Sequence, residues 1–122
     1  MTKTIIITAA GCLAIAVAIG AFGAHGLKSK LSPEMMTVYK TGVEYHFYHA
    51  LGLLLVGVLA LQMPSSLLNL SALFLFLGIV VFSGSLYALA VTGIKWLGAI
   101  TPIGGLSFIA GWVLLVVAVL KN

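Results

Sequence analysis

The chain has 122 residues, of which 62% are hydrophobic and only 7% are charged. A soluble globular domain carries about 25% charged residues, so this composition excludes a soluble protein and indicates an integral membrane protein. Six lysines against two glutamates give a formal charge of +4. Because the lysines stand at the ends of apolar runs, we expect them to meet lipid headgroups, and we expect no nucleic-acid partner.

Four apolar runs fill the chain, at residues 5–24, 44–62, 67–91 and 99–120. At about 1.5 Å per helical residue, each is long enough to cross a bilayer core of about 30 Å. They leave no room for a soluble region, so we predict a single membrane domain over residues 1–122. The expected fold class is an all-α integral membrane protein with four transmembrane helices, arranged as two antiparallel hairpins.

The first run has the length of a membrane span, although Gly11-Cys12 resembles a lipoprotein processing site. We expect it to remain in the protein. After Lys28 and Lys30, Ser32-Pro33-Glu34 combines a side-chain cap, proline at the first helical position and an acid in the first turn. This pattern predicts a helix start, with about 30 residues available before Pro64. Its first part is polar enough to form a short interfacial helix before Gly42 leads the chain into the second span.

Pro64-Ser65-Ser66 predicts a tight turn between the second and third spans, and Thr101-Pro102 predicts the start of the fourth helix. Four lysines fall on the side of the first and third loops, against two on the side of the termini. Lysine excess marks the cytoplasmic side. We therefore expect loops 25–43 and 92–98 to be cytoplasmic and both termini to lie outside.

Small residues recur on the predicted helices, where close backbone contact must replace the missing hydrophobic driving force in lipid. Frequent glycine and alanine in membrane helices would explain part of this pattern. At Gly84 we predict that leucine would separate the helices and disrupt the bundle. The residues assigned to helix packing are Gly20, Gly23, Gly84, Ala88, Gly104 and Gly111.

Polar side chains gather near the side of the first and third loops, while the opposite half of the membrane is almost purely apolar. This one-sided polar layer argues against a water-filled pore within one subunit. Ionisable residues at membrane depth suggest function, although near an interface tyrosines also serve as ordinary anchors. The candidate binding residues are His25, Glu44, Tyr45, His46, Tyr48, His49, Ser85, Tyr87 and Thr101.

The two histidines of the layer, His46 and His49, allow more than one interpretation. Each could donate a hydrogen bond across the bundle to Tyr87 or Ser85. They could also bind metal, but zinc requires three or four ligands and the His-Glu-x-x-His pattern is absent. We predict no metal and no cofactor.

Four ordered segments resemble the signature blocks of the YgdD/YwdK-type family, a group of small bacterial inner-membrane proteins with a domain of unknown function. The resemblance covers essentially the whole chain. It implies a four-helix membrane protein and supplies no activity, substrate or cofactor. The matching segments are Gly20–Leu27, Thr41–Leu51, Phe82–Tyr87 and Thr101–Gly105.

The leading functional hypothesis is a non-enzymatic membrane protein, expected to form a homo-oligomer, whose polar layer binds a small solute, an ion or a lipid headgroup. One alternative is a small transporter or channel whose pathway forms between subunits. Another is a structural or assembly subunit of a membrane complex. Enzymatic activity is not expected, because no aspartate, arginine or reactive cysteine joins the histidines and Glu44, and no motif activates a nucleophile.

Overall fold

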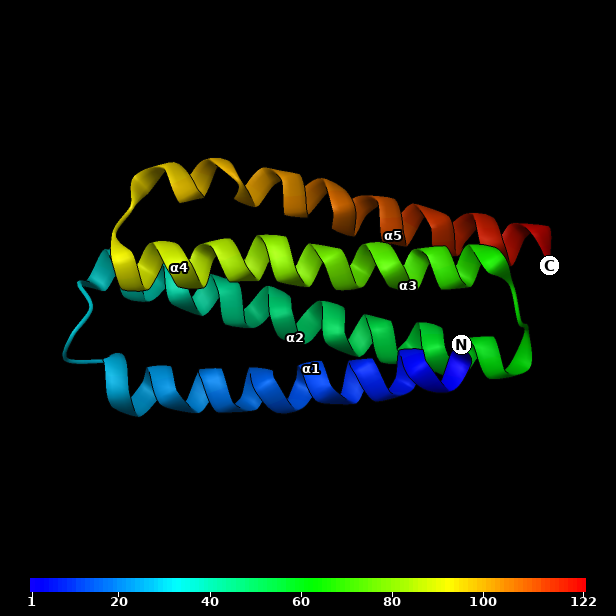
Figure 1. Cartoon of the computed structure of the whole chain (residues 1–122), viewed down its shortest axis with the longest axis horizontal. Helices are drawn as coiled ribbons and strands as arrows, with labels where there is room; N and C mark the ends of the chain where they lie inside the picture. The colour runs from blue at the N-terminus through cyan, green and yellow to red at the C-terminus, as the bar shows by residue number, and fades with distance from the viewer.

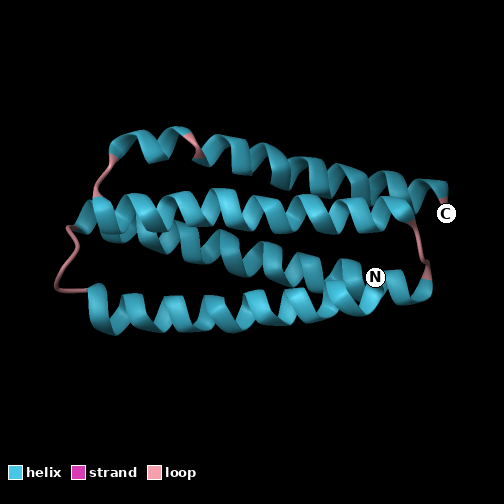
Figure 2. Ribbon diagram, in the orientation of Figure 1, coloured by secondary structure: helices cyan, strands magenta, loops and turns pink.

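The computed structural model describes residues 1–122 and consists of helices and connecting loops (Figure 2). Its four long apolar helices match the four predicted spans. The first is α1 (Thr2–Phe22) continued by η1 (Gly23–Leu27), and the second is α2 (Pro33–Gln62). The third comprises α3 (Ser66–Gly78), η2 (Ile79–Ser83) and α4 (Gly84–Thr92), and the fourth comprises η3 (Lys95–Ala99) and α5 (Thr101–Lys121).

The helices follow one another across the molecule in the order α1, α2, α3–α4 and α5 (Figure 1). Each is antiparallel to its neighbour, so α1 and α2 form one hairpin and α3–α4 and α5 form the other. The two hairpins meet through α2 and the third span. The loops after Leu27 and Thr92 lie at one end of the bundle, and the loop after Gln62 lies at the opposite end with the C-terminus. We call these ends the lysine-rich end and the terminal end.

Local sequence signals set the helix boundaries. The Ser32 hydroxyl accepts a hydrogen bond from the Met35 backbone N–H at 3.1 Å, and Pro33 occupies the first turn, which starts α2 where the sequence predicted. Gly93 has φ +72°, a left-handed conformation that glycine adopts without strain, and it ends α4.

The expected interfacial helix is not a separate element. The helix α2 continues without interruption from Pro33 to Gln62, and Gly42 does not end it. Gly42 is instead buried, and an added Cβ there would lie 2.8 Å from the Tyr87 ring. Its role is to let α2 approach the third span, and the helix passes through Gly42 into the second span without a break.

Glycine packing follows the prediction at some positions and not at others. A Cβ on Gly23 would collide with the Tyr39 ring, on Gly111 with Leu75, and on Gly104 with the backbone of Phe82. A Cβ on Gly20 would make only an ordinary contact, 3.5 Å from the Val43 side chain, and Ala88 is half-buried.

The packing role predicted for Gly84 is wrong. A Cβ at this position would have nothing within 4 Å. The reason is that Gly84 lies on a face of α4 that does not contact another helix. The spacing of small residues along the sequence does not determine which face that is.

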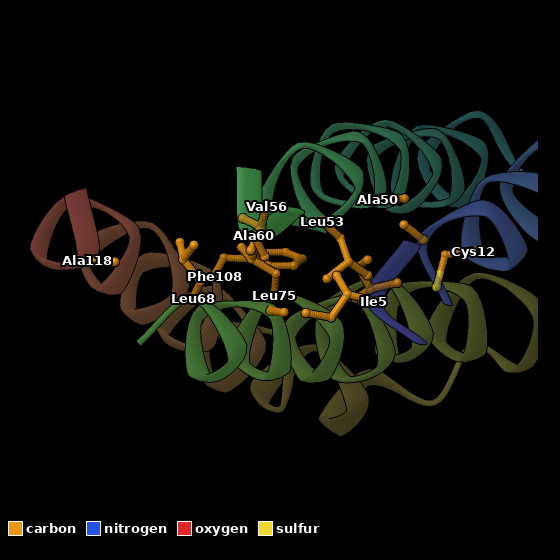
Figure 3. Close-up of a cluster of buried hydrophobic side chains, with 13 residues drawn as sticks. Ile5, Cys12, Ala50, Leu53, Val56, Ala60, Leu68, Leu75, Phe108 and Ala118 are labelled. Carbon is orange, nitrogen blue, oxygen red and sulfur yellow. The ribbon is translucent and has the colours of Figure 1, made fainter. Parts of the chain in front are cut away.

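Most of the buried apolar side chains form one cluster drawn from all four spans, which Figure 3 shows in close-up, and Leu27, Tyr39 and Ala90 form a second, smaller cluster. The main cluster joins Ile5 of α1 and Leu53 of α2, from the first hairpin, with Leu75 of α3 and Phe108 of α5, from the second. Buried serines add hydrogen bonds between helices. Ser71 donates to the Gly111 carbonyl at 2.7 Å, and Ser83 donates to the Gly42 carbonyl at 2.7 Å.

Replacing Ser83 by alanine should lower the free energy of unfolding by about 1 kcal/mol, within the range measured for interhelical hydrogen bonds in membranes. The hydroxyl is fully buried and joins the third span to α2. Unfolding by SDS titration of the purified protein measures the change. The exposed Ser29 provides the control through Ser29→Ala, and equal stability of the two variants would contradict the prediction.

Candidate functional site

Near the lysine-rich end, His46 faces the interior of the bundle. Its side chain is only 4% exposed, and its Nδ1 atom lies 2.9 Å from the Tyr87 hydroxyl of α4. This hydrogen bond between α2 and α4 is one of the contacts that the sequence suggested for His46. Tyr87 also packs against the Tyr39 ring, at 5.5 Å between ring centroids. The Tyr39 hydroxyl donates a hydrogen bond to the Ile19 carbonyl of α1 at 2.5 Å. These side chains therefore connect the first, second and third spans.

His49 lies one turn further into the membrane and is 7% exposed. Its Nδ1 atom lies 2.8 Å from the Tyr45 carbonyl of the same helix. The imidazole stacks on the Phe108 ring of α5, with 3.5 Å between centroids and 10° between planes, and Trp112 lies 5.7 Å away. The bond to Tyr87 or Ser85 considered for this histidine is therefore not formed. His49 joins an aromatic cluster between α2 and α5.

Two further members of the predicted layer meet between the third and fourth spans. The hydroxyls of Ser85 and Thr101 lie 2.6 Å apart, and Ser85 also donates to the Phe82 carbonyl at 2.9 Å. Tyr45 lies at the edge of the interior, with its ring 4.6 Å from the Phe82 ring. The structure thus brings together His46, His49, Tyr45, Ser85, Tyr87 and Thr101 in one end of the bundle.

The other three predicted residues lie on the outer surface, apart from the interior group. Glu44 and His25 are exposed, and Tyr48 is 57% exposed. The reason is helical geometry. Glu44 precedes His46 by two residues, which places it about 200° around the helix, so one helix cannot direct both side chains to the same interior.

Several residues of the site were not assigned to it from the sequence. Its position near the end of a span makes Tyr39 one of the tyrosines expected to serve as interfacial anchors, but it is buried and its hydroxyl is hydrogen-bonded to α1. Ser83 lies in a signature block but is not among the candidate residues. Phe108 and Trp112 are not among them either. Phe108 and Trp112 are four residues apart, which places both on one face of a helix. This spacing was the signal in the sequence that could have identified them as a pair.

On the outer surface, a small groove runs between α1 and α2 at the lysine-rich end. Its volume is 170 Å³. Small residues of the first span, Gly20, Gly23 and Ala24, form one wall. The other wall carries Lys40 and Glu44 from α2. The groove therefore places one positive and one negative group near each other on the outer surface of the lysine-rich end.

The interior and the surface differ in their capacity to bind a ligand. No buried side-chain nitrogen or oxygen lacks a hydrogen-bond partner, so the interior polar groups satisfy one another. Their arrangement supports the packing of α2 against its neighbours. By contrast, Lys40 and Glu44 are exposed and charged, and their groove is open for a polar molecule.

Comparisons with protein families and with individual proteins identify the same family. Residues 19–105 match the family described as protein of unknown function (DUF423). The UPF0382 membrane protein YwdK of Bacillus subtilis is 49% identical over 120 residues, which cover 98% of each chain. The UPF0382 membrane protein SH2409 of Staphylococcus haemolyticus is 52% identical over 119 residues, covering 98% of this chain and 97% of the relative. No solved structure matches the chain. The chain is thus a multi-pass bacterial membrane protein that belongs to the DUF423/UPF0382 family.

Proposed function

We propose that this protein binds a phospholipid headgroup, without catalysis, in the groove between α1 and α2. The observation that carries the proposal is the presence of Lys40 and Glu44 on one groove at the lysine-rich end. A lysine ammonium attracts a lipid phosphate, and a carboxylate accepts hydrogen bonds from an amine or hydroxyl. A headgroup with a phosphate and a terminal donor complements both side chains.

The size of the groove supports a headgroup over a free solute. Sites for drug-sized molecules have volumes of about 300–1,000 Å³. The groove, at 170 Å³, is smaller, but it opens to the membrane, so the remainder of a lipid can stay in the bilayer. Lys28 and Lys30 of the adjacent loop are also exposed and add positive charge at this end.

In this proposal the interior residues, including His46, His49 and Tyr87, hold α2 in the orientation that presents Lys40 and Glu44. Their mutual hydrogen bonds and stacking favour this positioning role over transport through the subunit. The excess of lysine favours the cytoplasmic face for this end. Assembly into a homo-oligomer belongs to the same proposal, with the exposed apolar helix faces as contact surfaces.

The test measures how added lipid stabilises the purified protein in detergent. Phosphatidylethanolamine and phosphatidylglycerol carry a terminal donor and should raise the melting temperature. Phosphatidylcholine, whose trimethylammonium group has no N–H, should raise it less. Glu44→Gln should weaken the apparent affinity for phosphatidylethanolamine at least about tenfold, equivalent to about 1.4 kcal/mol.

The matched control is Glu34→Gln, which removes the chain's other carboxylate from the first turn of the same helix, outside the groove. It should leave the lipid affinity unchanged. Equal affinity of the native protein and Glu44→Gln for all three lipids would refute the proposed site.

A further inference from the structure

A second and larger groove lies at the terminal end, far from Lys40 and Glu44. Its volume is 570 Å³, and it runs between α1 and α3 over Leu53 of α2. Here α1 packs mainly on α2 and leaves most of this face of α3 uncovered. The deeper wall is apolar and includes Ala72, Leu73 and Phe76.

The polar side chains of this groove lie mainly toward its outer end. Thr4 and Thr8 line it from α1, and Ser66 and Asn69 line it from the first turn of α3. None of the side-chain hydrogen bonds of the protein involves these four residues. Thr4 and Ser66 are exposed, and no polar atom here is buried without a partner, so these side chains are free to bond an occupant at this end.

The length of the groove selects the kind of occupant. From Ser66 to Phe76 it spans ten residues of the third span, or about 15 Å along the helix axis. This is half of a bilayer core of about 30 Å. A transmembrane helix of a partner would need a groove along the full thickness, whereas a lipid acyl chain occupies one leaflet.

We infer that this groove binds one phospholipid from the leaflet at the terminal end. Its acyl chain lies over Leu53 between α1 and α3. Its phosphate and ester oxygens accept hydrogen bonds from Thr4, Ser66 and Asn69. The exposed Lys3, adjacent to Thr4, gives this end a positive charge that complements the phosphate.

Photolabelling in vesicles tests the inference. The probe is phosphatidylglycerol with a diazirine in the middle of one acyl chain, and mass spectrometry locates the labelled residues. Leu73 in the groove and Val113 on α5 are 50% and 54% exposed, and each lies seven or eight residues from the terminal end of its helix. We expect Leu73 to carry at least about five times as much label as Val113, because a bound lipid exchanges more slowly than bulk lipid. Equal labelling would show ordinary bulk lipid, and weaker labelling of Leu73 would indicate another occupant, so either result overturns the inference.

Two variants sharpen this experiment. Thr8→Trp fills the groove and should bring the Leu73 label down to that of Val113. Ile7→Trp places the same side chain at an exposed position outside the groove. In this variant Leu73 should still carry more label than Val113. If Thr8→Trp does not fold, the ratio of Leu73 label to Val113 label in the native protein still tests the inference. Glu44→Gln should leave this labelling ratio unchanged. The experiment therefore tests this groove independently of the headgroup groove between α1 and α2.

Discussion

Replacement of Gly104 by alanine should lower the free energy of unfolding by about 3 kcal/mol, at the upper end of the usual cost of overpacking. The added Cβ would lie 2.7 Å from the Cα of Phe82 and closer still to its backbone nitrogen. Backbone atoms cannot rotate away as a side chain can. The third span and α5 would have to separate, and these two helices share the most extensive contact in the bundle.

Separation at Gly104 would also break hydrogen bonds on both sides of it. Thr101 lies 2.6 Å from Ser85, and Ser107 donates to the Phe74 carbonyl at 2.6 Å. Both bonds join α5 to the third span, and they lie three residues before and after Gly104. The loss of stability should therefore exceed the steric cost at one residue.

SDS titration or thermal unfolding in detergent measures this effect. Gly105→Ala is the adjacent control, since its Cβ would make an ordinary contact of 3.8 Å with the Phe82 ring. Gly84→Ala is a second control, with no neighbour within 4 Å. If the unfolding midpoint of Gly104→Ala equals that of Gly105→Ala, the close approach at Phe82 does not hold the hairpin together.

Replacement of His49 by alanine should cost about 3 kcal/mol of stability, comparable to truncating a buried aromatic residue. The imidazole fills the space between α2 and α5 and stacks on Phe108. Its hydrogen-bond acceptor, the Tyr45 carbonyl, belongs to the same helix, so the aromatic contact matters more than the bond. We therefore expect His49→Phe to lose less than about 1 kcal/mol, as a near volume-conserving replacement.

The pair of variants distinguishes a structural from a ligand-binding histidine. A structural His49 gives an unstable alanine variant and a stable phenylalanine variant, both with unchanged lipid affinity once folded. A ligand-binding His49 would give reduced affinity in both variants. Tyr48→Ala, on the exposed neighbouring position, controls for general effects of truncation and should leave the unfolding midpoint nearly unchanged.

The proposed headgroup groove depends on the division of the predicted polar layer into two parts. One part is internal and satisfied by its own hydrogen bonds, as His46 and Tyr87 illustrate. The other part, which includes Glu44, faces outward beside Lys40. A charged residue that faces the headgroup region costs far less than one that faces acyl chains, so Glu44 can stand there without an internal partner and remain free for a ligand.

The sequence alone determined the four spans and most of their ends. Apolar runs of about 20 residues are needed to cross a bilayer, and helix caps such as Ser32-Pro33 have local causes that can be recognised in a few residues. The sequence also suggested His46 with Tyr87 as a contact, because both are polar side chains at similar depth. Depth along a span follows from counting residues.

Only the tertiary structure decided how each helix is rotated about its axis. Leu53 and Leu55 of α2 are two residues apart, yet Leu53 is buried and Leu55 faces lipid. Acyl chains are as apolar as a packed core, so no hydrophobic stripe distinguishes the inner face from the outer one. For this reason the sequence grouped Glu44 with His46 by depth alone, assigned packing to Gly84, and gave no sign of the groove between α1 and α3.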